Sequence, residues 1–397
     1  MLDEVIALDR KYYMNTFGDR LPVCFTDGSG MKLIADNGKE YYDYLGGIAV
    51  NALGHGHPRF IGALKNQLDK IIHTSSLYYI ENQAKLAKKL VESTCADKVF
   101  FANSGAEANE GAFKLAKIYF YKKGIEKNEI ITLDKSFHGR TLATVAATGQ
   151  EKYQKPYKPL TPGFIQVEPN NYEAMEAAVT DKTAAIMIEL IQGESGVHPM
   201  DEEYVQKLRR LCDEKGILLI FDEVQTGIGR TGHLFAHQMY GVYPDIFTAA
   251  KALGGGIPIG AVCATAEVAS AFEPGDHGTT FGGNPFATAA GLAVLNILED
   301  ENLIENANKM GTFFKEKLLK LQSKHSDKIT EIRSAGLLIG IELKTEIAKA
   351  VFNKLFNDGF LTSLCGGNTI RIAPPLIINK LDIELFVSEL DTVLKEI

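Results

Sequence analysis

The middle of the chain alternates short apolar runs with longer amphipathic stretches. Between about residues 98 and 266, the runs with the length and composition of strands are KVFFAN, EIITL, FIQVE, AAIMIEL, ILLIFD, IFTAA and GAVCATA. The stretches SGAEANEGAFKLAKIYFYKK and DEEYVQKLRRLCDEKG, which lie between them, have helical spacing. This alternation predicts a mainly parallel, seven-stranded sheet with helices on both faces, whose ligands bind at the carboxyl ends of the strands.

The two ends of the chain have different patterns. Residues 20–45 indicate a small antiparallel meander with turns at DGSG and DNGK, and residues 300–397 mix helical stretches with strand-like pieces. We therefore predict an α/β fold in which residues 59–290 form a large domain. A smaller α+β domain is expected from residues 1–58 together with residues 291–397.

Composition narrows the classes of function. A net charge of -8 and a pI near 5.7 argue against binding to nucleic acids or membrane surfaces, which needs clustered Lys and Arg. Small metabolites are the expected partners. The five cysteines are scattered and form no CxxC pair, which is typical of a reduced, cytoplasmic protein. The first residues carry Asp3 and Glu4 where an export signal would be basic, so none is expected.

Two further alternatives follow from local patterns. Residues 278–298 carry little charge, but they contain Thr, Gly and Asn, so a packed Ala-rich helix from about Pro285 is expected rather than a membrane span. The GHGHP and HLFAH histidines have no Cys or Glu to complete a metal site, so no metal is expected.

A buried strand that ends in two carboxylates is the first sign of chemistry. The apolar run LLIF is followed directly by Asp222 and Glu223. Because an unpaired carboxylate is costly to bury, a charged Asp222 should face a cation. The next residues, GIGRTG, match a dinucleotide-binding fingerprint and raise the alternative of a nicotinamide dehydrogenase. That fingerprint must open a helix directly after the strand, whereas here the acidic DEVQT intervenes, so we do not favour it.

Two other sites complement Asp222. Ser104, Gly105 and Ala106 open a predicted helix with free backbone N–H groups and small side chains, which suits a phosphate, although an ordinary capping box of Ser104 with Glu107 has the same pattern. Lys251 lies among Ala, Leu and Gly, and a desolvated lysine becomes a nucleophilic amine suited to a Schiff base. A surface lysine is the simpler alternative for that residue alone.

Pyridoxal 5'-phosphate would satisfy all three sites. Its aldehyde requires a lysine, its phosphate suits a helix N-terminus, and its pyridine nitrogen must stay protonated to withdraw electrons. The ring nitrogen would then be the cation that Asp222 requires.

The chain resembles the class III, fold-type I pyridoxal-phosphate aminotransferases over nearly its whole length. The motifs that carry this resemblance are GGIAVNALGHGHP, NSGAEANE, SFHGRT, ELIQGESG, FDEVQTGIGRTG, KALGGGIPIGA, TTFGGNP and RIAPPL. The resemblance implies that Phe137 and Val224 pack on the two faces of the cofactor ring and that Gln225 binds the ring oxygen. It also implies a homodimer with shared active sites, in which Thr280 reaches the phosphate in the neighbouring subunit.

Two arginines are the expected carboxylate binders, since a guanidinium binds a carboxylate bidentately. The resemblance implies that Arg140 takes the carboxylate of N-acetylornithine or the distal carboxylate of 2-oxoglutarate, and that Arg371 takes the carboxylate beside the keto group. Glu189 is expected to pair with Arg371 while the amine donor is bound. Ile48 stands where ornithine aminotransferases carry an aromatic residue, which favours an acylated donor.

The resemblance thus implies transfer of the δ-amino group of N-acetylornithine to 2-oxoglutarate, which gives N-acetylglutamate 5-semialdehyde and glutamate in arginine biosynthesis. Lys251 would move the proton. Ornithine, succinylornithine, succinyldiaminopimelate and 4-aminobutyrate remain alternative donors, because one pocket side chain discriminates by only about 1–3 kcal/mol. Leu190 and Ser195 replace the Pro and Gly common in the family and leave the shape of the loop open. A non-catalytic binding protein of this fold is a further alternative, which the intact set of Asp222, Lys251, Arg140 and Arg371 opposes.

Overall fold

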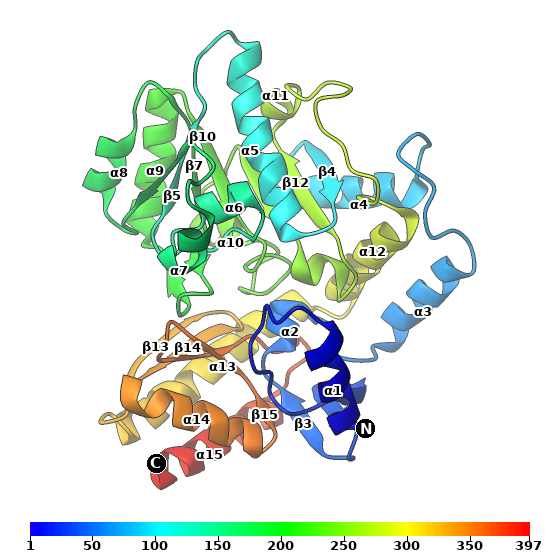
Figure 1. The fold of residues 1–397 in the computed structure, drawn as a ribbon, viewed down its shortest axis with the longest axis vertical. Coiled ribbons are helices and arrows are strands. Elements are labelled where there is room, and N and C mark those ends of the chain that lie inside the picture. The colour runs from blue at the N-terminus through cyan, green and yellow to red at the C-terminus, as the bar shows by residue number, and fades with distance from the viewer.

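The structure, a computed structural model, describes residues 1–397. Figure 1 shows an upper part built from the middle of the chain and a lower part built from both ends. None of its helices combines the length and the apolar content that crossing a membrane requires.

A seven-stranded sheet forms the centre of the upper part, in the order β4-β12-β11-β10-β7-β5-β6. Its strands are β4 (Lys98–Ala102), β5 (Glu129–Leu133), β6 (Phe164–Val167), β7 (Thr183–Ile188), β10 (Leu218–Asp222), β11 (Ile246–Ala249) and β12 (Gly260–Ala264). Only β12 runs antiparallel to its neighbours, β4 and β11. The prediction of a mainly parallel sheet from the seven apolar runs is confirmed.

Helices cover both faces of this sheet, and the strand residues divide between two cores. On β10, Leu219 and Phe221 join the larger core, whereas Leu218 and Ile220 join the smaller one. This period of two means that each face of β10 is packed, which explains its unbroken apolar run. The helices of this part are α3 (Pro58–Leu68), α4 (Glu81–Glu92), α5 (Gly105–Lys122), α6 (Leu142–Ala147), α7 (Glu151–Gln154), α8 (Tyr172–Ala178), α9 (Glu202–Lys215), α10 (Ala236–Tyr240), α11 (Ala266–Ala269) and α12 (Pro285–Asp300), with the 3-10 turns η1 (Lys155–Tyr157) and η2 (Lys251–Gly254).

The lower part joins the two ends of the chain in one sheet. The predicted meander is present as β1 (Phe25–Ser29), β2 (Lys32–Ala35) and β3 (Glu40–Asp43), and β15 (Phe360–Leu361) pairs with β3 in parallel. A second sheet has the order β13-β14-β17-β16. The remaining elements of the lower part are α1 (Leu2–Tyr12), α2 (Gly46–Ala49), α13 (Leu303–Lys324), α14 (Thr345–Asn357), α15 (Lys380–Glu396), β13 (Ile329–Ala335), β14 (Leu338–Leu343), β16 (Ser363–Cys365) and β17 (Thr369–Ile372). The hairpin of β8 (Ile191–Gln192) with β9 (His198–Pro199) follows β7 of the central sheet in the chain.

The positions of α12 and α10 test two predictions made from the sequence. The Ala-rich helix expected from Pro285 is α12. It continues through the predicted domain boundary at residues 290 and 291, and because a helix is one rigid element, we infer that the change of domain follows Asp300 instead. The GIGRTG segment opens no helix after β10, since α10 begins only at Ala236. The dinucleotide fingerprint therefore lacks its required context.

The short element α2 is a left-handed turn rather than an ordinary helix. The residues from Gly46 to Ala49 all have φ between 58° and 65°. Ile48 is β-branched, and the left-handed region costs a non-glycine residue roughly 1–2 kcal/mol. The Asp43 carboxylate accepts a hydrogen bond from the Gly46 N–H at 2.8 Å. A Cβ on Gly46 would lie 2.7 Å from the carbonyl oxygen of Ala373, so glycine permits the close approach of the C-terminal segment.

Candidate active site

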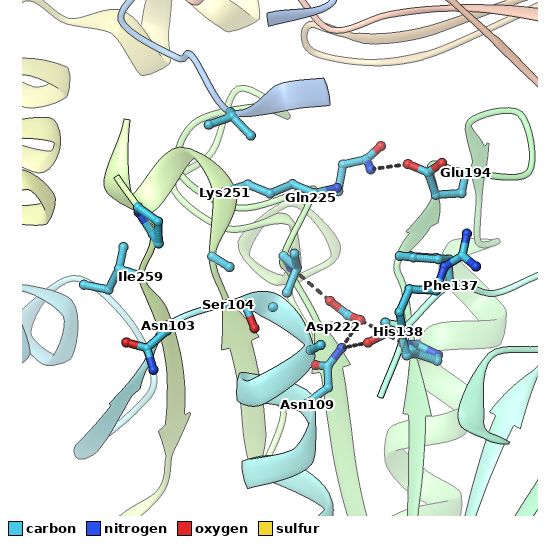
Figure 2. Close-up of a pocket in the computed structure, with 18 of the residues that line it drawn as sticks. Asn103, Ser104, Asn109, Phe137, His138, Glu194, Asp222, Gln225, Lys251 and Ile259 are labelled. Atoms are coloured by element: carbon cyan, nitrogen blue, oxygen red, sulfur yellow. Dashed lines mark hydrogen bonds and ion pairs between the residues drawn. The ribbon is translucent and has the colours of Figure 1, made fainter. Parts of the chain in front are cut away.

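A cavity of about 450 Å³ lies at the carboxyl ends of the central strands (Figure 2). The residues that line it are Val50, Asn103, Ser104, Gly105, Ala106, Asn109, Phe137, His138, Gly139, Arg140, Glu189, Glu194, Asp222, Val224, Gln225, Ala250, Lys251, Gly256, Ile257, Pro258 and Ile259. Most of the residues selected from the sequence therefore converge on one site. Ile48 and Thr280 are outside this lining, as is Arg371, which reaches the cavity through Glu194 and Gln225.

Asp222 ends β10 at the floor of this cavity and is 4 % exposed. One carboxylate oxygen, Oδ2, accepts a hydrogen bond from Asn109 Nδ2 at 2.8 Å and lies 2.8 Å from His138 Nδ1. The other oxygen, Oδ1, accepts from the Val224 N–H at 3.0 Å. Figure 2 shows these contacts below the row formed by Lys251, Gln225 and Glu194. Several donors thus fix the orientation of the carboxylate before any ligand binds.

Sequence analysis missed the residues that hold Asp222. Thr248 on β11 donates to Asn109 Oδ1 at 2.7 Å, which orients the amide so that its Nδ2 faces Asp222. His138 is 2 % exposed, and its Nε2 has no hydrogen-bond partner. His138 lies inside the SFHGRT motif, so its position next to Phe137 was the signal available.

Lys251 follows β11 and begins η2 with a left-handed φ of 45°. Its Nζ makes no hydrogen bond or ion pair with the chain. Burial lowers the pKa of Lys251 below its ordinary value, although the carboxylates of Glu194 and Asp222 oppose this effect. A larger fraction of the amine is therefore neutral and nucleophilic than for a surface lysine.

The N-terminus of α5 forms the predicted cradle. Ser104 Oγ accepts a hydrogen bond from the Glu107 N–H at 3.1 Å, so the predicted cap is present. The Glu107 carboxylate accepts from the Asn103 N–H at 2.7 Å rather than from the N–H of Ser104, as a strict capping box would require. A Cβ on Gly105 would lie 2.8 Å from Cγ1 of Val224. Glycine therefore allows the helix end and Val224 to line the same narrow space.

The structure does not place Glu189 beside Arg371, as was expected with the amine donor bound; Arg371 pairs with Glu194 instead. Arg371 Nη1 lies 2.6 Å from Glu194 Oε1 and donates to Gln225 Oε1 at 3.2 Å. Arg371 Nε donates to Ser363 Oγ at 3.1 Å. Although burial raises the pKa of Glu194, the charge of Arg371 and its hydrogen bond bring it below the ordinary value. Glu194 is thus a carboxylate held charged by Arg371.

Glu189 has a different environment at the end of β7. Its Oε2 accepts a hydrogen bond from the Phe137 N–H at 2.9 Å. Burial and the nearby charge of Asp222 raise the pKa of Glu189 well above its ordinary value. This carboxyl group holds the backbone of Phe137 in place and is a poor counter-ion for Arg371.

Arg140, Ile48 and Thr280 have distinct surroundings. The guanidinium carbon of Arg140 lies 3.7 Å from the ring centroid of Tyr153, and the side chain forms no ion pair. It therefore presents a positive charge at the cavity without a partner carboxylate. Ile48 is 43 % exposed, and Val50 lines the cavity near it. Thr280 lies in an exposed segment before α12, so a role in a neighbouring subunit stays a prediction.

The second strand-end carboxylate, Glu223, serves the fold. It is 1 % exposed and accepts hydrogen bonds from the Ala236 and His237 N–H groups at 2.8 and 2.7 Å, which caps α10. Thr226 Oγ1 donates to it at 2.5 Å, and His237 Nδ1 lies 3.0 Å away. The two adjacent carboxylates thus have separate roles.

These residues fit pyridoxal phosphate. The cavity brings together an amine without a hydrogen-bond partner at Lys251, a fixed carboxylate at Asp222 and free N–H groups at the first turn of α5. Lys251 would hold the aldehyde, Ser104 to Ala106 the phosphate and Asp222 the ring nitrogen.

Comparisons with known proteins agree with this chemistry. The model of the family described as aminotransferase class-III matches residues 13–394. The chain is similar to the acetylornithine aminotransferase of Methanocaldococcus jannaschii, at 50 % identity over 99 % of this chain and 98 % of the relative. It is also similar to the acetylornithine aminotransferase of Caldanaerobacter subterraneus, at 48 % identity over 99 % of this chain and all of the relative.

The fold is also similar to solved structures of aminotransferases. The ornithine aminotransferase of Toxoplasma gondii superposes with a TM-score of 0.95 at 33 % identity, covering all of this chain and 95 % of that one. The acetylornithine aminotransferase of Elizabethkingia anophelis superposes with a TM-score of 0.88 at 35 % identity, covering 100 % and 99 % of the two chains.

Proposed function

The chain belongs to the class-III aminotransferases, enzymes that use pyridoxal phosphate, and from that premise we propose that it transfers the δ-amino group of N-acetylornithine to 2-oxoglutarate. The products would be N-acetylglutamate 5-semialdehyde and glutamate, as in arginine biosynthesis. The observation that carries the proposal is the ion pair of Arg371 with Glu194, which covers one carboxylate site, while Arg140 stays unpaired at another.

The chain's own residues divide the catalytic work. When bound, pyridoxal phosphate supplies an aldehyde and an electron-withdrawing ring. Lys251 is a buried amine whose lowered pKa suits it to accept and return a proton at Nζ. Asp222 would keep a proton on the ring nitrogen of the bound cofactor, and the contacts from Asn109 and His138 prevent its carboxylate from turning away.

The donor is inferred from the charges at the cavity. Arg140 would bind the carboxylate of N-acetylornithine, and its stacking on Tyr153 fixes the plane of the guanidinium. Arg371, covered by Glu194, would not attract the donor's α-carboxylate. When 2-oxoglutarate enters, its carboxylate beside the keto group would replace Glu194 on Arg371. Glu194 therefore takes the role first expected of Glu189.

A panel of amine donors with 2-oxoglutarate tests the proposal. We expect kcat/KM for N-acetylornithine to exceed the values for ornithine, succinyldiaminopimelate and 4-aminobutyrate, with succinylornithine the nearest competitor because it shares the acylated α-nitrogen. A higher kcat/KM for free ornithine would assign the chain to the other activity found among its structural neighbours. The absence of transamination with every donor would favour a binding protein.

We also propose a homodimer with shared active sites. Leu77, Tyr78 and Tyr79 are 86 %, 68 % and 108 % exposed. Phe281, which follows Thr280, is 61 % exposed, and its ring centroid lies 5.5 Å from that of His73. Apolar side chains gathered on exposed segments indicate an interface, here with a second copy of the chain. Sedimentation should show that the chain is a dimer in solution. Thr280→Ala should weaken the affinity for pyridoxal phosphate but leave the dimer intact. A monomeric holoenzyme with full activity would exclude the shared site.

The five free cysteines support the cytoplasmic location that we propose.

A further inference from the structure

A cysteine, a histidine and a glutamate form a chain of contacts outside the active site. Cys95 lies in the turn between α4 and β4, and its Sγ is 3.8 Å from His237 Nε2. The other ring nitrogen, Nδ1, is 3.0 Å from Glu223 Oε1. A thiol, a base and a carboxylate that orients the base are thus in the order used to activate a nucleophile.

The imidazole is held in a single orientation. His237 is fully buried, and its ring packs on Phe235 and Phe247 with centroid distances of 5.8 and 5.2 Å. Although burial lowers the pKa of His237, hydrogen bonds to Cys95 and Glu223 raise it to about 9. Other titratable groups near this cluster are Tyr243, whose ring centroid is 6.2 Å from that of His237, Tyr240, which lies within the influence of the Glu223 charge, and Cys263 on β12, which lies within that of Cys95.

Glu223 is well suited to keep His237 cationic. It receives hydrogen bonds from two backbone N–H groups of α10 and from Thr226, which fix its carboxylate beside His237 Nδ1. A cationic imidazole beside a thiol favours the thiolate, which is the reactive form.

The five cysteines have very different environments. Cys212 and Cys263 are buried, and burial raises their thiol pKa values far above the ordinary range. Cys365 is also buried, with a raised pKa. Only Cys24 and Cys95 are partly exposed, and Cys24 has no imidazole at hydrogen-bond distance. Cys24 is therefore a natural control for Cys95 within the same chain.

We propose that Cys95 is a thiol activated by His237 and that it forms a reversible mixed disulfide with low-molecular-weight disulfides. The Sγ thiolate attacks one sulfur of the disulfide, a new S–S bond forms as the old one breaks, and the other half leaves as a thiolate. The thiol must lose its proton before this attack, and His237 Nε2, at 3.8 Å, is the group that would hold it. An external thiol reverses the exchange.

The experiment uses the holoenzyme and 5,5'-dithiobis(2-nitrobenzoate), with peptide mass spectrometry to identify each modified cysteine. At pH 6.5, Cys95 should react at least about tenfold faster than Cys24, because an unassisted thiol is almost entirely protonated there. Cys95→Ser should remove the fast phase. His237→Gln, which retains a polar side chain of moderate size but no cationic ring, should slow Cys95 to about the rate of Cys24.

A second measurement does not depend on the folding of the His237 variant. From pH 8 to pH 6.5 the rate at an unassisted thiol falls about tenfold per pH unit below its titration range, whereas the wild-type Cys95 rate should fall much less. Equal rates at Cys95 and Cys24 with parallel pH profiles would overturn the proposal. An unchanged Cys95 rate in a folded His237→Gln variant would do the same.

Discussion

Arg371 on β17 and Glu194 in the β8–β9 hairpin form an ion pair of 2.6 Å that joins the two parts of the chain across the active site. Arg371 is almost fully buried, whereas Glu194 is about one quarter exposed. The acid is therefore the partner that is freer to move when a substrate carboxylate competes for the guanidinium.

Glu194→Gln should change the balance between the two half-reactions. Removing the charge that covers Arg371 should raise the rate with glutamate relative to that with N-acetylornithine by about tenfold, which corresponds to about 1.4 kcal/mol. Stopped-flow measurement of both half-reactions checks this ratio. Glu189→Gln is the matched control and should leave it nearly unchanged, since Glu189 contacts the Phe137 backbone instead. Equal changes in both half-reactions of the Glu194 variant would mean that the pair is only structural.

Lys251→Ala should bind pyridoxal phosphate through the cradle of α5 and the contacts of Asp222 but lose turnover almost completely. The neutral amine that accepts the proton is absent, and no other lysine lines the cavity. Equilibrium dialysis measures the retained cofactor and a coupled assay measures activity. Near-normal activity would show that the lysine is misassigned.

Asp222→Asn should keep the shape of the site and remove its charge. The contact with a protonated ring nitrogen is worth about 4 kcal/mol in a surface-like dielectric, so the half-reaction rate should fall by about two to three orders of magnitude. The visible absorption of the bound cofactor provides a readout that is independent of turnover and should change with pH differently from wild type. A half-reaction at the wild-type rate would contradict the assigned role.

Gly105→Ala should weaken cofactor binding through a steric effect. The new Cβ would lie 2.8 Å from Cγ1 of Val224, and overpacking of this kind costs about 1–3 kcal/mol. We expect Kd for pyridoxal phosphate to rise at least about tenfold. Adding Val224→Ala should recover most of the loss, because the clashing methyl group is gone. If the losses of cofactor affinity caused by Gly105→Ala and Val224→Ala simply add in the double variant, the two residues do not compete for the same space.

Glu189 predicts a pH dependence of stability. Its pKa is raised in the folded protein, so its favourable contribution is complete below the ordinary glutamate pKa and is lost as pH rises toward the folded value. The Glu189→Gln variant has no ionisable group at this position. Its free energy of unfolding should therefore fall less than that of the wild type between pH 5 and pH 8. Urea unfolding of the two holoenzymes at each pH measures the difference. Parallel pH profiles would indicate that Glu189 is ionised in the folded state.

The elements that the sequence predicts well are those with a local signal. The strand β10 is an unbroken apolar run because both of its faces are packed, and Asp222 stands out at its end. Lys251 is recognisable because its neighbours are small and apolar. The cap at Ser104 depends on residues three apart and needs no knowledge of the rest of the chain.

The partner of Arg371 could not be predicted in this way. Glu189 and Glu194 lie in the same motif, and the turn at the end of β7 directs the first toward Phe137 and the second toward β17. That choice depends on a contact between residues 177 positions apart. The left-handed turn around Ile48 could not be predicted either, since a β-branched residue locally disfavours that conformation. The hydrogen bond from the Gly46 N–H to Asp43 and the backbone hydrogen bonds of the turn stabilise it.

The parallel pairing of β3 with β15 has a consequence for how the chain is made. Tyr42 and Asp43 pair with Phe360 and Leu361, which leave the ribosome long after the N-terminal meander. Throughout synthesis of the central sheet, β3 has an unsatisfied edge, and such edges invite pairing with other nascent chains. A chain that ended before residue 360 would therefore contain the cofactor cradle of α5 but would leave this edge of β3 unpaired.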